Sequence, residues 1–65
     1  MTKDEYRAEL KRLSAYVSIA ELLRDMGINA SNYYAFIAGE DRRLGAKTCD
    51  RIINALNKRP ISADA

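Results

Sequence analysis

The chain has 65 residues, of which 48% are hydrophobic and 31% are charged. This length accommodates one domain, and this balance is typical of an ordered globular domain rather than a disordered chain. The sequence contains no His and a single Cys. These counts exclude a Ser–His or Cys–His nucleophile pair and a zinc site built from His and Cys. We therefore expect no enzyme activity, no metal and no cofactor.

The expected cellular location follows from the lack of membrane-span, disulfide and secretion signals in the sequence. No apolar run approaches the roughly 20 residues that a membrane span needs, and one Cys makes no internal disulfide. Residues 1–5 are mostly polar, unlike the apolar segment of a secretion signal. We expect a cytoplasmic protein with no membrane partner.

Charge is distributed unevenly along the chain, although the net charge is only +2. Residues 1–41 carry five basic and seven acidic side chains, whereas residues 42–65 carry six basic and two acidic ones. The positive field therefore gathers in the last third of the chain. Such a field suits an anionic partner that contacts this part of the protein.

Four helices and no strand are predicted, in one domain over residues 1–59 that is followed by a flexible tail over residues 60–65. The first helix is predicted over Lys3–Val17, because Thr2 and Glu5 form a capping-box pattern. Its apolar residues recur at helical spacing and form one stripe. They are Tyr6, Leu10, Leu13 and Val17.

The second helix is short and is predicted over Ile19–Met26. Ser18 and Glu21 repeat the capping-box pattern at its start. Gly27 is placed for the left-handed residue just past a helix end. Two separate signals thus bound this helix.

The third and fourth helices are bounded by similar signals. Asn29 is a good N-cap for a helix that ends at Gly39. The fourth helix is predicted over Ala46–Asn57, with Pro60 preventing its continuation. The apolar residues of these two helices are Tyr33, Phe36 and Ile37, and then Cys49, Ile52, Ile53 and Leu56.

Residues 18–39 contain two short predicted helices that each end at a glycine, with a spacing of twelve residues between Gly27 and Gly39. The apolar and capping residues of this pattern are Leu22, Leu23, Met26, Ile28, Asn29, Tyr33 and Phe36, with Leu44, Ile52, Ile53 and Leu56 beyond it. In this spacing and these residues the segment resembles the lambda-repressor-like group, the phage Cro and repressor (XRE-type) DNA-binding domains. The resemblance covers residues 6–57 and implies an all-α helix-turn-helix domain of four to five helices.

The resemblance also implies a function, that of a small transcriptional regulator that occupies an operator in double-stranded DNA as a homodimer. The third helix would enter the major groove, with the loop that follows it on phosphates. The first N–H groups of the two motif helices, at Ser18 and Asn29, would also hold phosphates. The positions carried over from the family are Ala30, Ser31 and Ala35 on bases, with Asn32 and Tyr34 beside them, and the loop with Arg42 and Arg43 on phosphates. We expect Lys47, in the first turn of the next helix, to join these two arginines.

This chain departs from the family pattern at several positions. Ile19 and Ile37 replace the Gln and Glu that many relatives have there. The third helix contains no Arg, Lys or Gln, so bidentate Arg–guanine contacts are not available from it. Readout would then fall on Ser31, Asn32 and Tyr34 and on DNA shape.

An alternative function stays open beside DNA binding. A third helix that exposes Tyr34, Ala35 and Ala38 fits a protein surface about as well as a groove. The chain would then be a protein-interaction module, such as a phage-type inhibitor or antirepressor. Likewise, Arg42 and Arg43 have a second interpretation, in which they only balance the acidic residues before them.

Overall fold

The computed structural model describes residues 1–58, which form four α-helices and one short 3-10 helix and contain no strand. The predicted all-α class is thereby confirmed. The predicted tail over 60–65 and the role given to Pro60 lie outside the described residues. No helix within residues 1–58 combines the length and apolarity required to cross a membrane. The elements are α1 (Lys3–Leu13), α2 (Ile19–Met26), α3 (Ala30–Ile37), η1 (Asp41–Arg43) and α4 (Ala46–Lys58).

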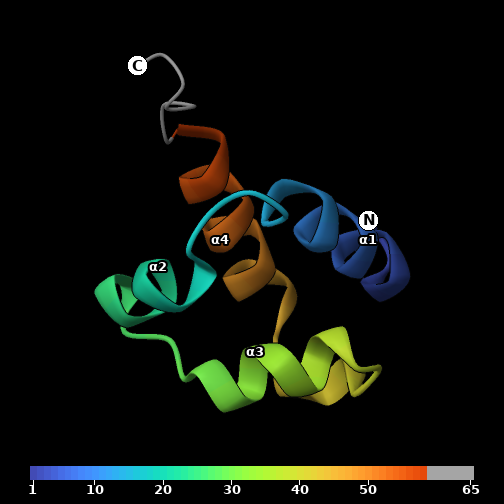
Figure 1. The fold of residues 1–65 in the computed structure, drawn as a ribbon. Helices are drawn as coiled ribbons and strands as arrows, with labels where there is room; N and C mark the ends of the chain where they lie inside the picture. Colours follow the sequence, from blue (N-terminus) through green and yellow to red (C-terminus); the bar gives the residue numbers. More distant parts are fainter. Residues whose placement is uncertain (59–65) are drawn as a thin grey trace.

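The helices are arranged around α4 (Figure 1). In this view α1 lies on one side of α4 and α2 on the other, while α3 runs across the end where α4 begins. The most extensive packing is between α1 and α4, and α3 packs against η1, α1 and α2. One core can therefore receive side chains from all four α-helices.

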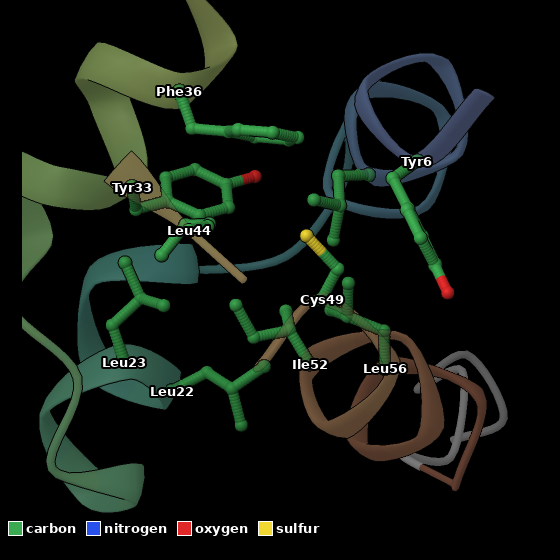
Figure 2. Packing of buried hydrophobic residues seen from close by; sticks show 10 residues of the cluster. Tyr6, Leu22, Leu23, Tyr33, Phe36, Leu44, Cys49, Ile52 and Leu56 are labelled. Atoms are coloured by element: carbon green, nitrogen blue, oxygen red, sulfur yellow. The ribbon is translucent and has the colours of Figure 1, made fainter. Parts of the chain in front are cut away.

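The core is apolar and is formed by side chains of the four α-helices and by Leu44, which lies between η1 and α4. Figure 2 shows Tyr33, Phe36 and Leu44 on one side of it, with α2 and α4 side chains facing each other below. Leu23 and Phe36 have no exposed surface. No polar or charged residue in the described part of the chain is buried. The core comprises Tyr6, Leu10, Leu22, Leu23, Tyr33, Phe36, Leu44, Cys49, Ile52 and Leu56.

The first helix is shorter than predicted. Its capping box is present, with the Glu5 backbone N–H donating to the Thr2 hydroxyl and the Thr2 N–H donating to the Glu5 carboxylate. However, α1 ends at Leu13, and residues 14–16 form a turn. The predicted extension to Val17 is wrong, because a helix of that length would leave only Ser18 to reverse the chain before α2. Val17 still packs against the core from the turn.

The bounds of the two central helices are close to those predicted. Gly27 adopts φ 74°, and the Ile28 N–H donates to the Leu23 carbonyl, so the left-handed end of α2 is confirmed. Gly39 follows α3 with φ 121°. The capping box predicted at Ser18 is wrong, since the Ser18 side chain makes no capping hydrogen bond at ψ 87°.

A side-chain hydrogen bond joins α4 to α1. Cys49 N–H donates to the Gly45 carbonyl at the start of α4, as expected if Gly45 precedes the helix. In the same helix, Asp50 Oδ1 accepts a hydrogen bond from the Tyr6 hydroxyl of α1 at 2.9 Å. The predicted end at Asn57 is one residue short, because α4 continues to Lys58, the last described residue.

Truncation of the core provides a first test of this packing. We expect Leu23→Ala to lower the free energy of unfolding by about 2–4 kcal/mol, because Leu23 is fully buried. Ile53→Ala should cost clearly less, because Ile53 is only half-buried at the edge of the core. Urea denaturation of both variants measures the two values. Equal losses would contradict the assigned positions of these residues.

The tie between Tyr6 and Asp50 predicts a pH dependence. The hydrogen bond to Asp50 raises the pKa of Tyr6, and burial and the Asp50 charge act in the same direction. Between the ordinary tyrosine pKa and this raised one, the unfolded chain has lost a proton that the folded chain keeps. The stability from Tyr6 is therefore complete below the ordinary pKa and is lost as pH rises through the raised one.

The matched variant for this test is Tyr6→Phe, which removes only the hydroxyl. Wild-type protein should be more stable than Tyr6→Phe at neutral pH, and the difference should shrink as pH rises through the alkaline range. Urea denaturation at a series of alkaline pH values follows this difference. Burial also raises the pKa of Tyr33, but that contribution is common to both proteins. A difference that stays constant with pH would contradict the prediction.

Candidate nucleic-acid interface

The third helix is held so that one face lies on the core and the other is open. Its inner face carries Tyr33 and Phe36, both buried. Ser31, Tyr34 and Ala38 are exposed. Only short side chains flank Tyr34 on the open face, so a large partner can approach the helix backbone closely.

The predicted base-contacting residues divide into two groups. Ser31 is exposed, as its predicted role requires. Ala30 and Ala35 are half-buried, and Ala30 packs against the core. Asn32 is also half-buried. The open surface of α3 is therefore narrower than the sequence pattern predicts, and Ser31, Asn32 and Tyr34 carry its polar groups.

Tyr34 is the largest exposed side chain of α3. Its ring packs edge-on against that of Tyr33, with ring centroids 5.4 Å apart and an angle of 80° between the planes. Even so, 51% of Tyr34 remains exposed. The Tyr34 ring therefore packs partly against the domain and keeps an exposed face and hydroxyl, while its predicted contact with a base stays a prediction.

The N-termini of α2 and α3, both predicted to bind phosphates, differ in how far their backbone N–H groups are already engaged. Asn29 caps α3, and its Oδ1 accepts from the backbone N–H groups of Ser31 at 2.7 Å and Asn32 at 3.4 Å. Two donors at this helix start are therefore already engaged. At the start of α2, the exposed Ser18 side chain engages none. The backbone N–H groups at the N-terminus of α2 are therefore less engaged by the cap residue than those of α3.

The segment after α3 forms the short helix η1 and carries two arginines. Arg42 is exposed. Arg43 donates through Nε to Glu40 Oε1 at 3.1 Å and through Nη1 to Asn32 Oδ1 at 3.2 Å. The second interpretation of the basic residues therefore applies to Arg43, whose charge is paired, more than to Arg42. Lys47 is exposed in the first turn of α4.

A pair of basic residues on α1 fixes this segment in place. Arg7 Nε donates to the Phe36 carbonyl at 2.7 Å, and its guanidinium also forms ion pairs with Asp4 and Asp41. Lys3 Nζ donates to the carbonyls of Asp41 at 2.7 Å and Leu44 at 2.8 Å. The cationic groups of both side chains lie near the Phe36 ring, at 5.7 Å for Lys3 and 4.8 Å for Arg7 from its centroid.

The chemistry of Arg7 favours a permanent contact. An arginine side chain keeps its charge at ordinary pH, and the hydrogen bond to Asp41 raises the pKa of Arg7 further. A cation on the last carbonyl groups of a helix also complements the helix dipole. Arg7 therefore closes the C-terminus of α3 and holds the start of η1 at once.

The sequence alone predicted no contact for Lys3 or Arg7. Apart from Asp4, their partners lie 29 to 41 residues away in the sequence, so no local pattern indicates them. No role was predicted for Arg51 either, which follows Lys47 at a spacing of four and is likewise exposed. That spacing on one helix face is a signal that sequence reasoning can use.

Residues 1–58 contain no group of three or more His, Cys, Asp or Glu side chains arranged to hold a metal ion. Cys49 is buried in the core, and burial raises the pKa of its thiol.

Comparison of the chain with family models, with curated proteins and with solved structures found no match.

The anchoring by Arg7 predicts a local effect on the segment after α3. Arg7→Met keeps an apolar stem against Phe36 but removes every hydrogen bond of the guanidinium. We expect amide hydrogen exchange at Arg43, whose N–H is bonded to the Glu40 carbonyl, to accelerate by about tenfold. Arg12→Met is the control, because within residues 1–58 Arg12 pairs only with Glu9 on its own helix. Equal exchange at Arg43 in both variants would show that Arg7 does not hold the segment.

Proposed function

We propose that this chain is a small sequence-specific DNA-binding regulator that occupies an operator through a helix-turn-helix motif made of α2 and α3. The observation that carries the proposal is the arrangement of α3. It is capped by Asn29, fixed on the core by Tyr33 and Phe36, and open on its other face. A helix held in this way can enter the major groove with its N-terminal residues at base edges.

Charge around α3 supports the same proposal. The start of η1 is tied to α1, so the exposed Arg42 is carried by a segment of fixed position beside the C-terminus of α3. Lys47 is exposed in the first turn of α4, which begins three residues after η1 ends. Such residues act on phosphates, which set the register of a protein on a duplex without reading sequence. Three polar side chains of α3 remain for the bases, namely Ser31, Asn32 and Tyr34.

A symmetric pair of chains completes the proposed mechanism. One domain of this size offers few contacts to DNA, whereas two recognition helices about 34 Å apart read a palindromic site. Regulation would then be steric, since a dimer on the operator blocks other proteins from the same DNA. The homodimer is part of the proposal and is tested by sedimentation with and without duplex.

A second function is favoured by one observation, the exposed ring of Tyr34 beside small residues. In this alternative the same face of α3 docks on another protein. The two functions assign different importance to Tyr34 and Arg42. A protein interface loses affinity mainly when Tyr34→Ala is made, whereas phosphate binding is weakened mainly by Arg42→Ala.

The salt dependence of DNA binding tests the proposed function. Fluorescence anisotropy of a labelled random-sequence duplex is measured at several salt concentrations. We expect log K to fall linearly with log salt, with a slope of about −3 or steeper for each protomer, because several phosphates are neutralised. Absence of binding at low salt would reject the proposal and favour the protein-interaction module.

Matched variants locate the phosphate contacts. Arg42→Ala should reduce the magnitude of the slope by about 1, since one phosphate contact is lost. Lys58→Ala removes the same charge at the far end of α4 and should leave the slope nearly unchanged. Equal effects of the two substitutions would mean that net charge alone drives binding and that η1 is not at the interface.

A further inference from the structure

The side chain of Asn32 is bound from outside its own helix. Arg43 of η1 donates through Nη1 to Asn32 Oδ1, and through Nε to Glu40 Oε1. The backbone N–H of Asn32 is engaged as well, by Asn29 Oδ1. Asn32 is therefore the one predicted base-contacting residue that is held both at its backbone and at its side chain within the described structure.

The contact with Arg43 decides which way the Asn32 carboxamide is turned. A guanidinium carries hydrogen-bond donors and no acceptor, so only the amide oxygen of Asn32 can face it. The ion pair with Glu40 restricts the guanidinium in turn. What Asn32 leaves available to a ligand is then chiefly its Nδ2 amide group, which donates two hydrogen bonds.

We propose that Arg43 is a positioning residue that makes Asn32 a hydrogen-bond donor toward base edges in the major groove. This inference rests on the proposed function and adds a specificity to it. Guanine, adenine and thymine all present an acceptor there, at N7, O6 or O4. Cytosine presents only its N4 amino donors, which face the Asn32 amide group unfavourably. The base that Asn32 contacts is therefore guanine, adenine or thymine, and cytosine is rejected.

The consequence of removing Arg43 is specific. In Arg43→Met the carboxamide can rotate by half a turn, so that Oδ1 accepts from cytosine N4. The matched control is Arg42→Met, which loses the same charge on the same segment but leaves the contact to Asn32 intact. Asn32→Asp replaces the donor by an acceptor, so its preference should turn toward cytosine.

The first measurement needs no DNA. Nuclear magnetic resonance of the full chain follows the Asn32 side-chain amide signals. Arg43→Met should shift and sharpen these signals as the carboxamide becomes mobile, and Arg42→Met should leave them in place. Unchanged signals in Arg43→Met overturn the inference, whatever the chain binds.

The second measurement determines base preference, by selection from a randomised duplex followed by anisotropy on the selected site with each base at one position. Wild-type protein should discriminate against cytosine by about tenfold at one position of the half-site. Arg43→Met should lose most of this discrimination, whereas Arg42→Met should weaken binding to all four duplexes equally. Equal discrimination in both variants overturns the inference while the proposed function stands. Absence of DNA binding by the wild type rejects the proposed function and the base preference together. The contact between Arg43 and Asn32 is then tested by the nuclear magnetic resonance experiment alone.

Discussion

The arrangement of this domain depends on the contact between Arg7 and the C-terminus of α3. Helix ends leave carbonyl groups without partners, and here Arg7 donates to one of them, that of Phe36, from a different helix. The same guanidinium pairs with Asp41, so one side chain fixes both the end of α3 and the start of η1. Lys3 adds hydrogen bonds to the carbonyls of Asp41 and Leu44. The short helix η1 has no buried residue of its own, so these contacts add to its packing against α3 in fixing its position.

This anchoring links the core to the candidate interface. Phe36 is fully buried, and the two cations lie near its ring, so the apolar core and the polar ties meet at one residue. The position of η1 in turn brings Arg43 to Asn32, across a separation of 11 residues in the sequence. A short path of side-chain contacts therefore runs from α1 through η1 to the first turn of α3, where the proposed base-contacting residues begin.

Much of the fold follows from local sequence signals, and the exceptions have physical causes. Gly27 and Asn29 bound their helices as predicted, because a left-handed residue and a side-chain cap act within a few residues of the chain. The end of α1 was predicted wrongly, since Val17 continues the apolar spacing of the helix from a turn and both geometries bury it. Ser18 has the right residue type for a cap, but its backbone conformation directs the side chain elsewhere.

The candidate site could be predicted only in outline, because its details arise from contacts between distant residues. Periodicity places Ser31 on the open face of α3, but it does not show that Asn32 is held by Arg43 or that Arg42 is left exposed beside it. Two adjacent arginines that look equivalent in the sequence thus differ in their contacts, since Arg43 is bonded to Glu40 and Asn32. If Arg42 contributes charge and Arg43 contributes orientation, affinity and base preference reside in neighbouring residues. Affinity and base preference can then change independently, which would allow such a small domain to alter its target sequence without losing its affinity for DNA.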